Sequence, residues 1–164
     1  MEYHLIGYGS LMSHQSLRET IPDKHFTPVI VKGYKRIFNL AEKNGDVLNL
    51  IKSRKSFFNG VLFKVNEKEL IKIKKREDEY NLEETSAYDF LTKKKLCKCL
   101  IVTDNIISID RKKRKPDKSY FTLCRESAYH ISKEFGRYWD NTSFISNGQK
   151  VSNWIKNHPE YQTL

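Results

Sequence analysis

The alternation of apolar and polar positions predicts short strands with helices inserted among them. Periodicity of two is typical of strands, and spacing of three and four is typical of helices. Strands are expected at 3–8, 27–41, 47–51, 57–65, 84–91 and 96–103. Helices are expected at 14–19 after the cap Ser13, at 66–78 with Asn66 as its cap, at 122–135 with its end near Gly136, and at 151–157. Gly33 should mark a bend or bulge within its strand. This irregular order favours an α+β fold whose mostly antiparallel sheet curls toward a barrel.

Composition supports one folded domain over residues 1–164. Of the 164 residues, 38% are hydrophobic, and nine tyrosines, nine phenylalanines and two tryptophans can fill a core, which excludes a wholly disordered chain. No apolar run reaches the ~18 residues of a membrane span, and the first residues lack the features of a signal peptide. We therefore expect a cytoplasmic protein that does not contact membranes.

Three cysteines, Cys97, Cys99 and Cys124, fit reduced thiols in that compartment. Cys97 and Cys99 are two apart within a predicted strand, so both can face the core. No histidine pair supplies matching zinc ligands. We expect no metal.

The chain carries 30 basic and 20 acidic residues, a net charge of +10. Such an excess raises nucleic acid, an anionic membrane or an anionic small substrate as partners, although a lysine-rich background gives the same number. The densest basic segment, Arg111 to Lys115 within a loop that extends to Lys118, has no aromatic residues interleaved and no nucleic-acid motif beside it. A solvated loop is the favoured interpretation, and a nucleic-acid partner is not expected.

Candidate chemistry begins where the first strand gives way to a helix, at Tyr8, Gly9, Ser10 and Leu11. Such a turn leaves successive backbone N–H groups unpaired, and these can hold a carboxylate or a phosphate. Gly9 lets a ligand approach the backbone closely. An ordinary strand–helix turn would have the same sequence.

Glu77 is the second candidate. On a helical wheel at ~100° per residue, Glu77 falls between Leu70 and Ile73 on the face that should meet the core, while Lys72, Lys75 and Arg76 take the outer side. A carboxylate on an apolar face needs a partner or a raised pKa, and a raised pKa suits a general base. The alternative is a helix-end glutamate paired with Lys74.

Tyr129 is on the predicted helix 122–135, where a tyrosine usually packs in the core with its hydroxyl satisfied at the edge, so the residue pattern alone favours packing over a site. The chain has no G-x-S-x-G, Walker A or G-x-G-x-x-G motif, so the common hydrolase and nucleotide-binding patterns are not indicated.

Several segments, in order, resemble the γ-glutamylcyclotransferase-like superfamily, especially its ChaC-like and AIG2-like branches. Residues 6–12 (IGYGSLM) are similar to its glycine loop, and 31–38 (VKGYKRIF) to its second-strand signature. Residues 59–65 (NGVLFKV) resemble the strand before the catalytic helix, and 70–77 resemble that helix. Tyr129 with Gly136 is similar to a C-terminal helix whose tyrosine lines the pocket, and 142–154 to a tail of small bacterial members. Tyr80 stands where a glycine–tyrosine pair often follows, but Glu79 precedes it in place of glycine.

The resemblance implies a small mixed β-barrel flanked by helices, and an enzyme that cyclises a γ-glutamyl group to 5-oxoproline with release of an amine. Glu77 would be the general acid/base, with Tyr8, Gly9, Ser10, Leu11 and Tyr129 binding the substrate. No cofactor is expected. Glutathione, γ-glutamyl amino acids and γ-glutamyl amines all remain open as substrates, and the oligomeric state is undetermined. A non-catalytic ligand- or protein-binding module on the same fold is the alternative.

Overall fold

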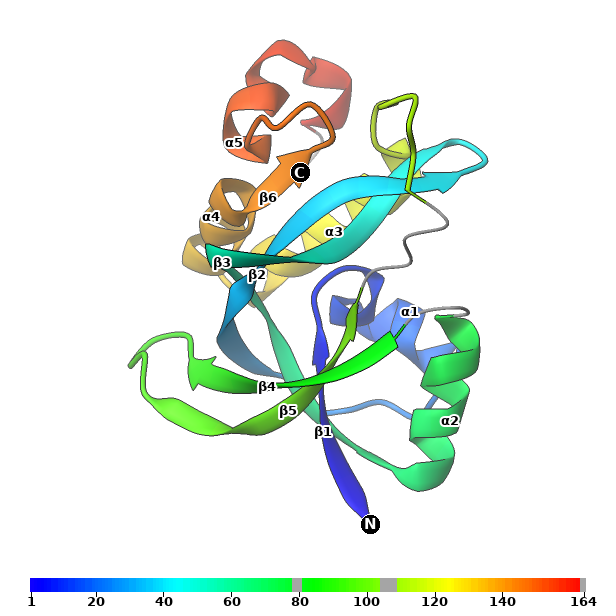
Figure 1. The fold of residues 1–164 in the computed structure, drawn as a ribbon, viewed down its shortest axis with the longest axis vertical. Helices are drawn as coiled ribbons and strands as arrows, with labels where there is room; N and C mark the ends of the chain where they lie inside the picture. Colours follow the sequence, from blue (N-terminus) through cyan, green and yellow to red (C-terminus); the bar gives the residue numbers. More distant parts are fainter. Residues whose placement is uncertain (78–80, 104–108, 163–164) are drawn as a thin grey trace.

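Six strands form one sheet (Figure 1) in a computed structural model that describes residues 1–77, 81–103 and 109–162. The strands are β1 (Glu2–Gly7), β2 (Thr27–Glu42), β3 (Gly45–Asn66), β4 (Asn81–Asp89), β5 (Lys95–Thr103) and β6 (Ser143–Ile145). Their order is β3-β1-β5-β4-β2-β6, and β2 also pairs with β3, so the pairings of five strands close a ring. The β1–β5 and β2–β6 pairs are parallel, and the other named pairs are antiparallel. The expected α+β fold is confirmed.

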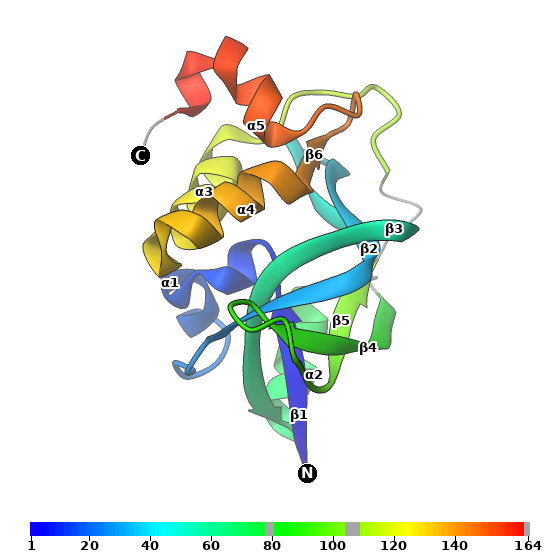
Figure 2. The ribbon, with the colours of Figure 1, turned by 90° about the vertical axis from the view of Figure 1, so that its left-hand side faces the viewer.

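The helices gather at two places around this sheet (Figure 2). They are α1 (His14–Arg18), α2 (Glu67–Arg76), α3 (Lys118–Ile131), α4 (Lys133–Thr142) and α5 (Val151–Trp154), with short 3₁₀ helices η1 (Ser10–Met12), η3 (Ile155–Asn157) and η4 (Pro159–Tyr161). α3 and α4 pack together beside β3, and α3 also contacts η1. α2 lies against β1 and β3. None of the described helices is long and apolar enough to span a membrane.

Local signals fix the start of α2 and the bend of β2 as the sequence predicts. The Asn66 side chain accepts a hydrogen bond from the Glu69 N–H, and the Glu69 side chain accepts one from the Asn66 N–H. Gly33 has φ +90°, and the β2–β3 register shifts between Lys32 and Tyr34 around it. Because most residues avoid that φ, glycine permits the bulge.

The two strands expected at 47–51 and 57–65 are one strand, β3. The polar residues 53–56 between them predict a break in the strand. In the structure they continue the strand as a bulge, and no residue of β2 pairs with them. β2 and β3 therefore form one long hairpin, whose turn at 43–44 lies far from the glycine loop in sequence.

The helix expected at 122–135 is present, but its bounds differ from the prediction. α3 begins at Lys118, because the Asp117 side chain accepts a hydrogen bond from the Tyr120 N–H. It ends at Ile131, and Ser132 caps the new helix α4 by accepting from the Phe135 N–H. Gly136 therefore lies within α4 and does not end a helix.

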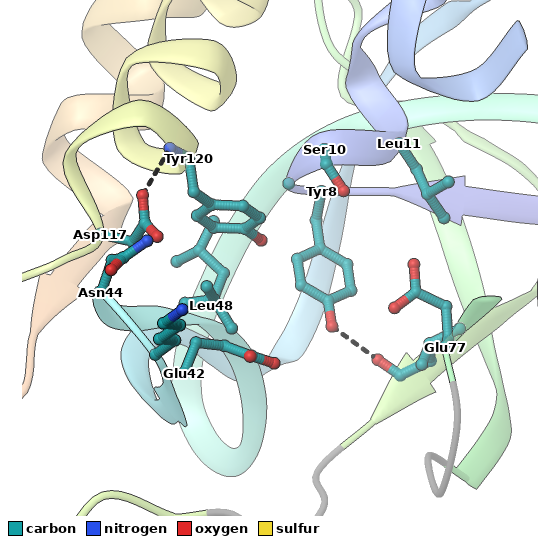
Figure 3. A pocket seen from close by; sticks show the side chains of 13 residues that line it. Tyr8, Ser10, Leu11, Glu42, Asn44, Leu48, Glu77, Asp117 and Tyr120 are labelled. Carbon is teal, nitrogen blue, oxygen red and sulfur yellow. Dashed lines mark hydrogen bonds between the residues drawn. The ribbon is translucent and has the colours of Figure 1, made fainter. Parts of the chain in front are cut away.

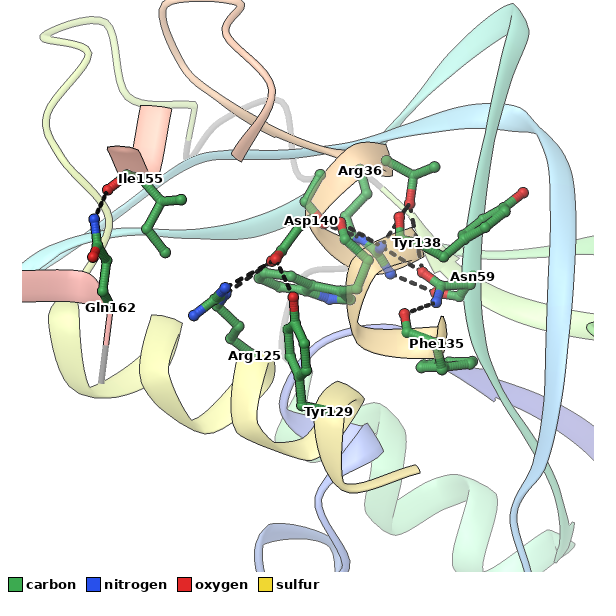
Figure 4. Close-up of polar contacts among 12 residues, drawn as sticks. Arg36, Asn59, Arg125, Tyr129, Phe135, Tyr138, Asp140, Ile155 and Gln162 are labelled. Atoms are coloured by element: carbon green, nitrogen blue, oxygen red, sulfur yellow. Dashed lines mark hydrogen bonds and ion pairs between the residues drawn. The ribbon is translucent and has the colours of Figure 1, made fainter. Parts of the chain in front are cut away.

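A buried arginine ties several elements together (Figure 4). Arg36 on β2 has no exposed surface, yet its guanidinium donates hydrogen bonds to neutral acceptors throughout. The acceptors are Ser143 Oγ (2.8 Å), Asn59 O (2.5 Å) and Oδ1 (2.7 Å), Thr142 Oγ1 (3.0 Å), Tyr8 O (3.3 Å) and Trp139 O (3.4 Å). Burial lowers the pKa of Arg36 to about 9, so the group stays charged at neutral pH. This cluster joins the glycine loop to β3, α4 and β6.

Candidate active site

A cavity of about 430 Å³ opens beside the glycine loop (Figure 3). Its walls come from the loop after β1, the tip of the β2–β3 hairpin, the end of α2, β5 and the start of α3. The lining residues are Tyr8, Gly9, Ser10, Leu11, Glu42, Lys43, Asn44, Val47, Leu48, Glu77, Val102, Asp117 and Tyr120. The fold therefore brings together five of the six residues that the sequence points to.

The loop from Tyr8 to Leu11 presents backbone donors to this cavity. β1 ends at Gly7 and η1 begins at Ser10. Within the described part of the chain, the N–H groups of Gly9, Ser10 and Leu11 donate to no other protein group. The Tyr8 hydroxyl donates to Val102 O at 3.0 Å, which fixes its ring against β5. Adjacent unpaired N–H groups of this kind suit a carboxylate.

Gly9 also sets the spacing between the loop and α3. A Cβ at this position would lie 2.6 Å from the Tyr120 hydroxyl oxygen, so any larger residue would push the ring away. The absence of a side chain lets Tyr120 lie directly over the loop. Glycine here permits this close approach.

Glu77 enters the cavity from the end of α2. It is the C-cap residue of that helix, and its N–H donates to Ile73 O at 3.0 Å. Its side chain is 22% exposed. Burial raises the pKa of the Glu77 carboxyl, and the positive charge of Arg76 opposes this shift. The alternative partner considered from the sequence, Lys74, makes no ion pair with Glu77 among the residues that the structure describes.

The helical wheel places Arg76 on the outer side of α2, but in the structure its side chain turns inward. Its guanidinium donates to Ser16 O (2.8 Å), Ser16 Oγ (2.5 Å), Thr20 Oγ1 (3.0 Å) and Ser10 Oγ (3.2 Å). Arg76 Nε also lies 3.8 Å from Glu77 Oε1. The side chain turns inward because the last turn of α2 packs beside α1, where these acceptors would otherwise lack a donor. Arg76 thus links the Ser10 hydroxyl to the carboxylate across the cavity wall.

Together these groups can hold a zwitterion and move a proton. Loop N–H groups can bind a carboxylate, and a carboxyl of raised pKa can accept and return a proton near neutral pH. Leu11, Val47, Leu48 and Val102 give apolar surface beside them. Across residues 1–77, 81–103 and 109–162, no three His, Cys, Asp or Glu side chains gather in a way that would hold a metal ion.

The fold can be compared with solved structures, although no protein-family model and no curated protein sequence matches the chain. A γ-glutamyl cyclotransferase superposes with a TM-score of 0.71 at 15% identity, over 96% of this chain and 97% of that one. An uncharacterized protein from Homo sapiens gives 0.70 at 17%, over 95% and 96%. A yeast γ-glutamyl cyclotransferase specific to glutathione gives 0.56 at 10%, over 98% and 96%.

The chain has the γ-glutamyl cyclotransferase-like fold. The fold that these sequence segments imply is therefore confirmed. At these identities the likeness concerns the fold, and the chemistry of this cavity has to be argued from the residues of this chain.

Tyr129 does not line the cavity of this γ-glutamyl cyclotransferase-like fold. Its hydroxyl donates to Asp140 Oδ2 at 2.6 Å, beside Arg125, which holds the same carboxylate (Figure 4). Its ring lies on Gly136, where a Cβ would come within 2.3 Å of Tyr129 Cγ. The pair that resembles a pocket motif is thus a contact between α3 and α4. The tyrosine of α3 that reaches the cavity is Tyr120.

Glu79 and Tyr80, singled out beside Glu77, lie outside the described residues. The sequence does not predict the residues on the wall opposite Glu77. Glu42 and Leu48 of this wall belong to the hairpin tip, and Asp117 and Tyr120 belong to the start of α3. Asp117 after Pro116 is a readable helix cap that would have moved the start of α3. The sequence does not predict that the hairpin tip lies beside the glycine loop, because this proximity depends on the closure of the sheet.

Proposed function

We propose that this protein is an enzyme of the γ-glutamyl cyclotransferase type, which converts a γ-glutamyl amide to 5-oxoproline and a free amine. The observation that carries the proposal is the placement of Glu77, a half-buried carboxyl of raised pKa, in one cavity with the unpaired N–H groups of the glycine loop. The likeness in fold to γ-glutamyl cyclotransferases supports it.

In the proposed reaction, the loop N–H groups of Gly9, Ser10 and Leu11 bind the α-carboxylate of the substrate. Glu77 takes one proton from the α-ammonium, and the freed nitrogen attacks the γ-carbonyl carbon of the same molecule. A new C–N bond closes the five-membered ring, and the amide C–N bond breaks. Glu77 returns its proton to the leaving nitrogen, and the second proton lost by the ring nitrogen converts the released amine to its ammonium form.

This reaction requires few catalytic groups because the nucleophile and the electrophile belong to one molecule. Holding them in a reactive geometry supplies much of the rate enhancement, and a single acid/base adds roughly 10²–10⁴-fold. A small cavity with one suitable carboxyl therefore suffices.

The test is release of 5-oxoproline from glutathione, γ-glutamyl-alanine and γ-glutamyl-ε-lysine. We expect wild type to release it from at least one substrate, and Glu77→Gln to lose roughly 10³-fold or more while remaining folded. Glu84→Gln, which changes an exposed glutamate on β4, is the matched control and should keep wild-type activity.

A folded Glu77→Gln protein with full activity would contradict the assignment of the base. Tight binding of a γ-glutamyl compound without product would support a binding module on the same fold instead.

A further inference from the structure

The charge of the cavity is opposite to that of the chain. The protein carries 30 basic and 20 acidic residues, yet among the residues that the structure describes three acidic side chains line the cavity, Glu42, Glu77 and Asp117, against one basic side chain, Lys43. Glu77 has a role in the proposed reaction. Glu42 and Asp117 lie across the cavity from Glu77 (Figure 3).

Glu42 points its carboxylate into the cavity from the last position of β2 (Figure 3). In the described part of the chain this carboxylate makes no hydrogen bond or ion pair. Asp117 differs, because its Oδ1 already accepts from the Tyr120 N–H and the Ser119 hydroxyl at the start of α3. Of the two carboxylates on this wall, Glu42 is therefore the one that no described protein group holds in place.

The backbone that carries Glu42 is held in place. Arg114 Nη2 donates to Glu42 O at 2.6 Å and its Nε to Asp110 Oδ2 at 2.8 Å. The Asp46 N–H donates to Lys115 O at 3.0 Å, and the Asp117 N–H donates to Asp46 O at 2.9 Å. The hairpin tip is thus fixed to the segment before α3, and this fixes the backbone position from which the exposed Glu42 side chain extends.

A substrate bound as proposed would span the two walls. Its α-carboxylate would lie at the loop N–H groups and its α-ammonium at Glu77, so the leaving amine would point toward Glu42. A carboxylate favours a cation within a few ångströms and repels a second carboxylate, and solvent screens but does not remove the effect. The terminal charge of the leaving group is therefore the substrate property that this wall can distinguish.

We propose, resting on the proposed function, that Glu42 is a specificity-determining residue that selects γ-glutamyl amides whose leaving amine carries a second, positively charged amine. Diamines are the simplest members of this class. Leaving groups that end in a carboxylate are disfavoured.

The test uses three γ-glutamyl amides with four-carbon leaving groups of matched size: 1,4-diaminobutane, butylamine and 4-aminobutanoate. They end in an ammonium, a methyl and a carboxylate. We expect kcat/KM for 5-oxoproline release to fall in that order, by roughly five- to tenfold at each step. Glu42→Gln should bring the ammonium-to-methyl ratio close to one, and Glu84→Gln should leave the ranking as in wild type. Raising the salt concentration should compress the wild-type ratios.

Equal rates for the three amides, a preference for the carboxylate, or an unchanged ranking in Glu42→Gln would overturn the role of Glu42 and leave the proposed function standing. Absence of 5-oxoproline from these amides and from the three peptides tested above, with a folded protein, would overturn the proposed function and this inference with it.

Discussion

Two arginines hold the glycine loop, and their surroundings differ. Arg36 reaches it from β2 and binds Tyr8 O, while Arg76 reaches it from α2 and binds Ser10 Oγ. Arg36 is fully buried among neutral acceptors. Arg76 keeps 19% of its side chain exposed and lies beside Glu77, a carboxyl whose pKa is raised. The first arginine holds elements of the fold together, and the second couples the loop to the proposed base.

The positive charge has a different role at each of these two arginines. Arg36 replaces its lost water with hydrogen bonds to β3, α4, β6 and the loop, so removing it leaves several buried acceptors unpaired. Arg76 bonds to α1 and the loop, but its charge also acts on a group proposed to exchange protons. We therefore expect Arg36 variants to lose stability and Arg76 variants to change activity and its pH dependence.

The largest effect is expected for Arg36→Lys. Lysine keeps the charge but lacks the planar fork that reaches Asn59, Ser143 and Thr142 together. We expect a loss of about 3 kcal/mol or more in the free energy of unfolding, measured by urea denaturation. Arg137→Lys, at an exposed position of α4, is the control and should unfold at the wild-type midpoint. An unchanged midpoint for Arg36→Lys would remove its structural role.

Arg76→Gln should act mainly on catalysis. Its positive charge favours the ionised form of Glu77, so its loss should raise the Glu77 pKa further. Because the proposed base works deprotonated, the lower limb of the kcat/KM profile should move to higher pH. At pH 6 we expect kcat/KM to fall roughly 10- to 100-fold, measured as 5-oxoproline release from the best substrate.

Arg76→Lys separates charge from shape, because it retains the positive charge. Its pH limb should lie closer to that of wild type than the limb of Arg76→Gln. A drop in kcat/KM that is equal at every pH in both variants would mean that Arg76 only supports the structure.

The smallest effects are expected for substitutions of two tyrosines of α3. As with the two arginines, we expect one of them to affect activity and the other to affect stability. Tyr120→Phe removes from the cavity a hydroxyl that can hydrogen-bond to the substrate, and should lower kcat/KM about tenfold. Tyr129→Phe removes one donor from Asp140 and should cost about 1 kcal/mol of stability while kcat/KM stays at the wild-type value. Parallel assays of unfolding and 5-oxoproline release test both. The reverse pattern would return Tyr129 to the site.

Local signals in the sequence predict much of this fold. Asn66 and Ser13 cap helices as expected, and Gly33 bends β2. The α3–α4 boundary escaped prediction because Ser132 is as ordinary inside a helix as at its cap. The continuity of β3 escaped because residues 53–56 carry no apolar pattern where β2 offers them no partner.

The candidate site divides similarly. The glycine loop and Glu77 could be found because a turn and a helical face are local properties of the chain. Glu42 and Tyr120 reach the same cavity only through closure of the sheet and the packing of α3, which no spacing in the sequence encodes. Arg76 was placed outward because a helical wheel describes one helix and takes no account of the acceptors on α1.

The central claim is that Glu77 is the acid/base whose proton controls the reaction. The most direct measurement is the titration of its side-chain carboxyl by carbon NMR, set beside the kcat/KM profile of the wild-type protein. We predict a pKa above the ordinary value near 4.5, raised by burial, that coincides with the lower limb of the rate profile. A Glu77 carboxyl that titrates at its ordinary pKa, while the rate limb falls elsewhere, would contradict the account.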